Sequence, residues 1–308
     1  MRTWPIPASS KPTGRWPGPA FTPRAAPCSV PRISSGNWRW NKHMNRFEDV
    51  IKRMTINPVI RNIGRVIDKK HFPGIPIFVT ASPRSGTTLL LSILGAHPNI
   101  YAVPEQTYAF SRWTRTPFRR YREYPYRIDR LYREFILKGF DRSANRWCEK
   151  TPRHVEYIEK IVEFYGGSVQ IIHLIRDGRD VVVSSHPTHT GRHYWVSANR
   201  WLKSVQAGWS LREKPYLHTV FYEDLVRDYR SEIREICDFL NEPYTKSLEN
   251  WIDTTNIRES IHIGGKLQPV HTGAVGKWKR PEHRERVAEF MTDPDAVAML
   301  RELGYSVP

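Results

Sequence analysis

Cysteines are scarce in this sequence, with only three among 308 residues, and they lie far apart. Such spacing gives neither a disulfide framework nor the ligand pattern of a zinc site. Long apolar runs are also missing, because no stretch approaches the roughly 20 residues that cross a bilayer. The first residues lack the apolar centre of a signal peptide. These absences predict a soluble, cytoplasmic protein without a transmembrane anchor.

Acidic residues are absent before Phe47, in a stretch where prolines recur. Such a segment cannot bury enough apolar area to offset its ordering entropy, so we expect residues 1–45 to be a disordered, basic leader. An organelle transit segment, or an upstream start with Met44 as the working start, would give the same composition. After it we expect a helical segment at 46–73, interrupted near Pro58, and one large domain at 74–308.

The formal net charge is +17 and the pI is about 9.9. This balance favours anionic partners such as phosphate ligands, acidic polymers or acidic peptides. A merely solvated basic surface, or a nucleic-acid partner, would fit the charge equally well. Charge therefore does not choose among these functions.

Apolar runs alternate with helical patterns along the domain, which predicts an α/β fold with a central parallel β-sheet flanked by helices. In such sheets ligands bind at the carboxyl ends of the strands, where the loops 81–86 and 176–184 lie. The expected strands are 77–80, 147–148, 169–175 and 217–221, and the expected helices are 87–95, 107–113, 126–138, 153–165, 177–185, 193–213, 228–240 and 285–303.

The loop Pro83-Arg-Ser-Gly-Thr-Thr88 joins the first strand to its helix. A loop of this kind presents unpaired backbone N–H groups at the positive end of a helix, where a phosphate can bind. It has the outline of a Walker A motif, but Thr87 stands where the lysine would be, and the cation is Arg84. The loop is therefore predicted to hold a nucleotide phosphate without the usual Mg-ATP chemistry.

A second segment runs from an apolar strand into Arg176, and Ser184 follows eight residues later. A guanidinium and a hydroxyl at this edge of the sheet could clamp a second phosphate group. The alternative is a salt-bridged helix start, in which Asp177 and Asp180 cap the helix and Arg179 pairs along it.

Taken together, these motifs resemble the sulfotransferases that use 3′-phosphoadenosine-5′-phosphosulfate (PAPS). The pattern is most similar to the tyrosylprotein sulfotransferases, which share the step Ala96-His-Pro98, a glutamate seven residues later, and Lys150-Thr-Pro152. The resemblance runs from about residue 76 to Tyr305. The matching segments are Pro83–Thr88, Ile175–Ser184, Phe221–Leu225 and Gly273–Trp278.

The resemblance implies a P-loop-like fold, PAPS as co-substrate, an O-sulfotransferase activity toward a hydroxyl acceptor, and no required metal. Glu105 matches the general base, and Arg84 and Lys150 match the cations that steady the transferring sulfonate. The implied cofactor contacts are Pro83, Arg84, Ser85, Gly86, Thr87 and Thr88 at the 5′-phosphate, Arg176 and Ser184 at the 3′-phosphate, Tyr222 at the adenine, and Lys277 and Trp278 in a closing loop, with Ser260 as a weaker candidate.

The small-molecule branch of the family carries its catalytic histidine where this chain has Pro152, so His154 is a weaker candidate for the base. Two departures from the tyrosylprotein pattern leave the acceptor open. Thr107 replaces an arginine that helps the site, and Ala102 replaces the cysteine that would pair with Cys148. The acceptor hydroxyl could therefore belong to a carbohydrate, a tyrosyl side chain or another alcohol.

Arginines and aromatic residues alternate through 112–133. This stretch could line a cleft for an acidic peptide, an anionic sugar or an aromatic acceptor, or it could form a basic helix surface that covers the sheet. We expect no nucleic-acid partner, and a homodimer stays open.

Two other function classes remain. A P-loop-type small-molecule kinase should carry a Walker lysine after Gly86. A non-catalytic binder of anionic polymers would explain the charge but would not need Glu105, Lys150 and Arg84 at these positions. In that case Glu105 would merely cap a helix at Thr107, and Lys150 would be a surface lysine.

Overall fold

The computed structural model describes residues 55–115, 123–137, 140, 143–186, 194–257 and 269–307. The expected leader at 1–45 and Ser260 lie outside these residues, as does part of the arginine-rich stretch. Every described residue belongs to one unit of the chain, Val50–Pro308.

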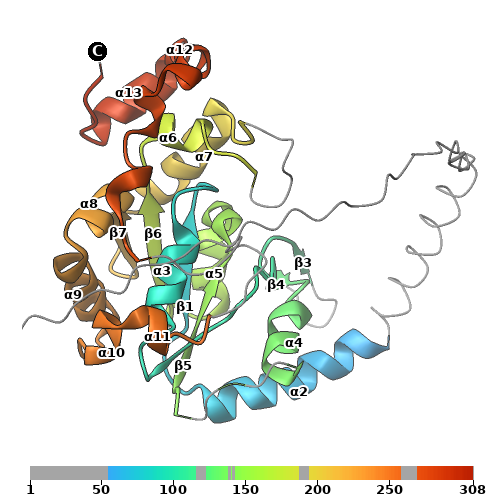
Figure 1. The fold of residues 1–308 in the computed structure, drawn as a ribbon. Coiled ribbons are helices and arrows are strands. Elements are labelled where there is room, and N and C mark those ends of the chain that lie inside the picture. The colour runs from blue at the N-terminus through green and yellow to red at the C-terminus, as the bar shows by residue number, and fades with distance from the viewer. Residues whose placement is uncertain are drawn as a thin grey trace, which may run out of the picture. The chain divides into compact units, whose positions relative to one another are not determined.

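A five-stranded sheet with the strand order β2-β5-β1-β6-β7 organises the fold (Figure 1). All of its neighbouring strands pair in parallel, which confirms the predicted sheet. Because β1 lies between β5 and β6, the carboxyl ends of these three neighbouring strands lie side by side at the loop 81–86. The strands are β1 (Ile77–Ala81), β2 (Ile100–Ala102), β5 (Arg146–Lys150), β6 (Gln170–Ile175) and β7 (Leu217–Phe221).

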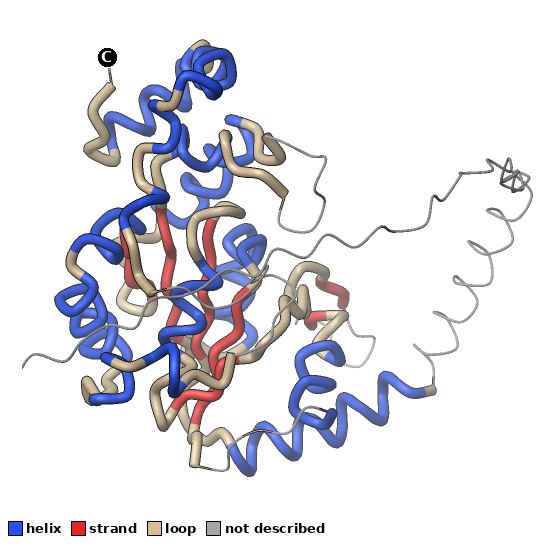
Figure 2. The backbone as a smooth tube through the Cα atoms, viewed as in Figure 1, coloured by secondary structure: helices blue, strands red, loops and turns tan. Residues whose placement is uncertain are grey.

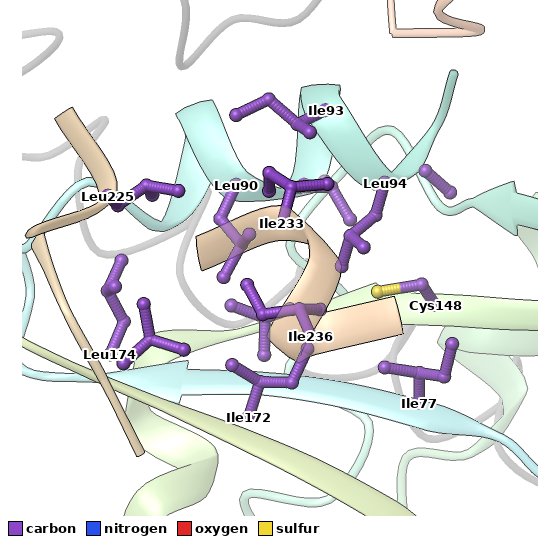
Figure 3. Close-up of a cluster of buried hydrophobic side chains, with 14 of the residues drawn as sticks. Ile77, Leu90, Ile93, Leu94, Cys148, Ile172, Leu174, Leu225, Ile233 and Ile236 are labelled. Carbon is purple, nitrogen blue, oxygen red and sulfur yellow. The ribbon is translucent and has the colours of Figure 1, made fainter. Parts of the chain in front are cut away.

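One face of the sheet is covered by α3 (Thr87–Leu94) and α9 (Tyr229–Leu240). Figure 3 shows the buried leucine and isoleucine side chains of these helices packed over Ile77 and Ile172 of the strands. Successive side chains of a strand point to opposite faces, so the strand residues that alternate with Ile77 and Ile172 point to the other face of the sheet.

On the second face, Phe78, Trp147 and Ile171 pack against α5 (Ile158–Phe164) and α4 (Asp129–Leu137). Helix α2 (Ile56–His71) lies on α4, where Gly64 permits the contact because an added Cβ would come within 2.2 Å of Tyr132 Cβ. Helices therefore cover both faces of the sheet (Figure 2).

A third cluster of buried side chains lies beyond the carboxyl end of β6. It joins α6 (Gly178–Val182), α7 (Ala198–Trp209), α12 (Arg284–Met291) and α13 (Pro294–Glu302). The remaining helical elements are η1 (Pro152–Tyr157), α8 (Tyr222–Arg227), α10 (Lys246–Glu249), α11 (Trp251–Thr254), η2 (Thr272–Ala274), η3 (Lys277–Lys279) and η4 (Pro281–His283).

The expected helix at 107–113 is wrong. The chain there is a loop that leads into a small antiparallel hairpin, β3 (Trp113–Arg115) with β4 (Glu123–Pro125). Tyr108 has a left-handed φ of 52°, which an α-helix does not accommodate. Glu105 therefore does not cap a helix at Thr107.

Other helix boundaries also differ from expectation. The helix expected at 126–138 begins at Asp129, and the one expected at 193–213 is α7, Ala198–Trp209. Pro58 does not interrupt α2 but lies in its first turn, where a helical N–H has no intrahelical partner. In the part of the chain that the structure describes, no helix has the length and apolar character to cross a bilayer.

Candidate active site

The loop after β1 has the backbone shape of a phosphate loop. Arg84 and Gly86 both have left-handed φ angles, 73° and 93°. For Arg84 this conformation costs of order 1–3 kcal/mol and is typical of functional sites. At Gly86 a side chain is excluded, because an added Cβ would lie 2.4 Å from Tyr222 Cδ2. The first N–H groups of α3 then point out of the helix without intrahelical partners.

Arg176, at the end of β6, lies directly against this loop. Its Nη1 donates to the carbonyl of Arg84 at 2.9 Å, and its guanidinium carbon lies 4.6 Å from the centre of the Tyr222 ring. The structure thus brings together the two segments that were predicted to hold the two phosphate groups. Tyr222 joins them, because its ring contacts both Arg176 and the Gly86 position.

Lys150, at the end of β5, approaches the same loop from the other side. Its Nζ donates to Thr88 Oγ1 at 3.3 Å, and the side chain is almost fully buried, so it is not a surface lysine. Burial lowers the pKa of Lys150 to about 8, although the charges of Glu149 and Glu105 act to raise it. Glu105 is therefore close enough to Lys150 for the two charges to interact.

Positive charge is concentrated around the loop. Burial, and then the charge of Arg176, lower the pKa of Arg84, and burial followed by the charges of Arg176 and Arg280 lowers that of Lys277. Arg84 Nε, Ser85 Oγ and Arg176 Nε are buried without a hydrogen-bond partner in the protein. Mutually repelling cations with unused donors fit a multiply charged anion such as a nucleotide phosphate.

The late loop around residue 276 is tied to the same corner. Asp180 accepts hydrogen bonds from the N–H groups of Gly276 at 2.7 Å and Trp278 at 2.9 Å. Arg176 Nη2 donates to the carbonyl of Ala274 at 2.5 Å. The carboxylate of Asp180 thus fixes the loop at 276–278, and no local pattern in the sequence indicates this contact.

Two of the predicted cofactor contacts, Ser184 and Trp278, bond or pack against residues of α6 rather than against the loop 83–88. Ser184 Oγ donates to the Asp180 carbonyl at 2.8 Å, within the turn that ends α6. The Trp278 ring packs on Arg179, whose guanidinium carbon is 4.0 Å from the ring centre. Arg179 also pairs with Asp177 at 2.8 Å, and Asp177 caps α6. Arg176 Nη2 lies 3.9 Å from Asp180 Oδ2, so a salt-bridged helix start is present together with the bond from Arg176 to the loop after β1.

His154 is fully buried, and its Nε2 accepts a hydrogen bond from the N–H of Phe110 at 3.2 Å. Its Nδ1 lies 3.0 Å from Glu149 Oε2. Both ring nitrogens thus face protein groups in the interior, and His154 is not placed to take a proton from an acceptor. Glu149 was not singled out from the sequence, because its partner Thr107 is 42 residues away along the chain.

Cys148 and Cys237 are buried, free cysteines. No group of three His, Cys, Asp or Glu side chains within the described ranges could hold a metal ion. The cytoplasmic location and the homodimer stay predictions.

Comparison with known proteins agrees with the geometry. The model of the sulfotransferase family matches residues 76–246. Protein-tyrosine sulfotransferase A of Caenorhabditis elegans is 28% identical over 262 residues, which cover 74% of this chain and 67% of that protein. An uncharacterized protein of Aquifex aeolicus is 24% identical over 273 residues, which cover 80% of this chain and 35% of that protein. The chain thus spans about one third and two thirds of the lengths of these curated relatives.

Among solved structures, the sulfotransferase domain of the olefin synthase from Synechococcus PCC 7002 superposes with a TM-score of 0.54 at 19% identity. The match covers 78% of this chain and 98% of that domain, and it supports the fold alone. The family match takes in the phosphate loop, Glu105, Lys150, Arg176 and Tyr222. The chain belongs to the sulfotransferase family.

Proposed function

We propose that this chain is a PAPS-dependent O-sulfotransferase with Glu105 as its general base. The observation that supports this most is the convergence of three strand ends on one loop, where Arg176 lies 2.9 Å from the Arg84 carbonyl and Lys150 lies 3.3 Å from Thr88. A nucleotide that carries phosphate at both its 3′ and 5′ positions needs two such anchors. A kinase would instead need the lysine that Thr87 replaces.

When bound, PAPS supplies an activated sulfonate on a phosphate leaving group. Glu105 would accept the proton of the attacking hydroxyl, and Lys150 and Arg84 would stabilise the negative charge that develops on the leaving side. Positioned cations perform the same electrostatic task in phosphoryl transfer. This assignment requires Glu105 and Lys150 to lie on either side of the transferring group, and the charge interaction between them is consistent with that arrangement.

The acceptor is inferred to be anionic. Arg130 Nη1 donates to the Thr107 carbonyl at 3.4 Å, two residues from Glu105. Burial, and then the positive charge of Arg127, lower the pKa of Arg130. The charges of Arg112 and Arg133 also lower it, whereas the carboxylate of Asp129 raises it. A group of arginines beside the proposed base would attract an acidic peptide or an anionic sugar before its hydroxyl is sulfonated.

Transfer of radiolabelled sulfonate from PAPS tests the proposal. We expect label on at least one hydroxyl acceptor from a panel of acidic tyrosyl peptides, uronate-containing oligosaccharides and neutral phenols, with anionic members preferred. Turnover should persist in EDTA, because Arg84 and Lys150 are proposed to neutralise the developing charge. A strict requirement for Mg²⁺ with ATP as donor would point to a kinase.

The rate should fall as the pH rises through about 8, the pKa of Lys150. The ammonium form is the active one, and its fraction decreases above that pKa, so kcat/KM for PAPS at pH 9 should be about one tenth of its plateau. Lys150→Arg is the matched control, because a guanidinium stays charged over this range and any remaining activity should not fall. An unchanged wild-type rate between pH 7 and pH 9.5 would remove Lys150 from the reaction.

A further inference from the structure

A buried carboxylate lies directly behind the proposed active site. Glu149, on β5, is fully buried, and one of its oxygens accepts hydrogen bonds from the N–H of Thr107 at 3.2 Å and from its hydroxyl at 2.8 Å. The same oxygen accepts from Thr151 Oγ1 at 2.5 Å. Glu149 therefore reaches from the central sheet to the loop that carries Glu105.

The neighbours of Glu149 extend this anchor along the loop. Thr151 Oγ1 accepts from the N–H of Tyr108 at 3.3 Å, and Thr107 Oγ1 accepts from that of Ala109 at 3.1 Å. His154 Nε2 accepts from the next N–H along the chain, that of Phe110. The four consecutive backbone N–H groups at 107–110 thus all donate to one buried cluster of side chains, which consists of Glu149, Thr151, Thr107 and His154.

The hydrogen bonds assign the proton of His154. Because Nε2 accepts from a backbone N–H, the ring proton belongs on Nδ1, which faces Glu149 Oε2 at 3.0 Å. Burial acts to raise the pKa of Glu149, but His154 and the hydrogen bonds from Thr151 and Thr107 outweigh it and lower that pKa. Glu149 is therefore an anion in the interior, with its three hydrogen bonds on Oε1 and the His154 ring 3.0 Å from Oε2.

Burying an anion costs desolvation free energy, and well-packed apolar side chains in the same place often give equal or greater stability. The position of Glu149 beside Lys150 suggests why a charge is present. Lys150 Nζ donates to Thr88 Oγ1 of α3, and Glu149, the residue before it on β5, is buried with it. Their side chains leave the strand on opposite faces, but both groups lie in the interior, where the charges of Glu149 and Glu105 act on Lys150. The two carboxylates oppose the loss of its proton that burial favours.

We propose that Glu149 is a positioning residue for the transfer reaction: through Thr107 it fixes the segment that carries Glu105, and its negative charge keeps the adjacent Lys150 in the ammonium form. This inference rests on the proposed function, because it gives Glu105 and Lys150 their roles. Glu149 does not touch the reacting groups, but it fixes the position of Glu105 and maintains the positive charge of Lys150.

The test compares two nearly isosteric variants. Glu149→Gln removes the charge, and we expect it to lower kcat at pH 7 by about 10–100-fold and to move the alkaline limb of the kcat profile to lower pH by on the order of one unit. Thr107→Val removes both hydrogen bonds of the Thr107 hydroxyl but keeps the charge of Glu149, so it should lower kcat and leave the alkaline limb in place. Glu156→Gln, on the exposed surface of η1, is the control and should change neither.

Hydrogen exchange of the 107–110 amides gives a readout that does not depend on turnover. We expect at least tenfold faster exchange in Glu149→Gln, with adenosine 3′,5′-bisphosphate still bound by the variant. Lower thermal stability with an unshifted pH profile would reduce Glu149 to a structural role and overturn the inference. If wild type binds the nucleotide but transfers no sulfonate, the proposed function fails first, and the catalytic role of Glu149 fails with it even where the exchange result holds.

Discussion

Replacement of Glu105 by glutamine should lower kcat by about 10²–10⁴-fold, the usual contribution of a general base. Glutamine keeps the size of the side chain but cannot accept the acceptor's proton as a carboxylate does. Because Glu105 lies in the loop after β2 rather than in the phosphate loop, binding of adenosine 3′,5′-bisphosphate should change by less than about threefold, or 0.7 kcal/mol. The measurement is steady-state transfer at saturating PAPS, with calorimetric titration of the bisphosphate.

Gln106→Ala is the matched control, since it changes the adjacent side chain in the same loop and should leave kcat within about threefold of wild type. A Glu105→Gln enzyme with turnover close to wild type would eliminate Glu105 as the base. Loss of nucleotide binding together with turnover would show instead that the substitution disturbs the cofactor site.

The second large effect is expected at Arg176. Arg176→Ala should weaken binding of adenosine 3′,5′-bisphosphate by about 10–150-fold, because a hydrogen bond to a charged group contributes about 1.5–3 kcal/mol. Binding of adenosine 5′-phosphosulfate, which lacks the 3′-phosphate, should weaken much less. Some loss of affinity for both ligands is expected, since Arg176 also donates hydrogen bonds to the carbonyls of Arg84 and Ala274.

Ser184→Ala separates these two effects, because Ser184 bonds only within the turn of α6 among the contacts described and does not touch the phosphate loop. Ser184→Ala should weaken binding of adenosine 3′,5′-bisphosphate by about tenfold or less and leave binding of adenosine 5′-phosphosulfate unchanged. Arg227→Ala, an exposed arginine of α8, is the control for a lost positive charge. Equal losses on both ligands in Arg176→Ala and in Ser184→Ala would contradict the 3′-phosphate assignment.

Local patterns in the sequence were sufficient for the centre of the fold. The apolar run before Pro83 and the helical pattern after Gly86 predict β1 and α3, and their order with Arg176 predicts the edge of the sheet where the site lies. Runs of buried β-branched residues and capped helices carry their signal within a few positions. For the same reason β2, with only three residues, and the β3–β4 hairpin gave no usable pattern.

What could not be predicted depends on contacts between distant residues. The loop at 107–110 has apolar residues at helix-like spacing, but its backbone N–H groups do not donate to helical carbonyls. Three of them donate to side chains of Glu149, Thr151 and His154, and the fourth donates to the Thr107 hydroxyl. Asp180 has the appearance of a helix-capping residue, yet it accepts from Gly276 and Trp278, almost 100 positions further along the chain. These side chains acquire their roles only once the sheet has formed.

Calorimetric titration of the wild-type chain with adenosine 3′,5′-bisphosphate in EDTA measures whether the chain binds a doubly phosphorylated adenosine without a metal ion. We expect saturable binding at one site per chain, with adenosine 5′-monophosphate binding much more weakly because it cannot reach Arg176. Heparin should not reproduce this behaviour, since a polyanion would occupy the basic surface without this stoichiometry. No heat of binding from the bisphosphate, or binding confined to Mg-ATP, would contradict the claim that the ends of β1 and β6 hold a doubly phosphorylated adenosine.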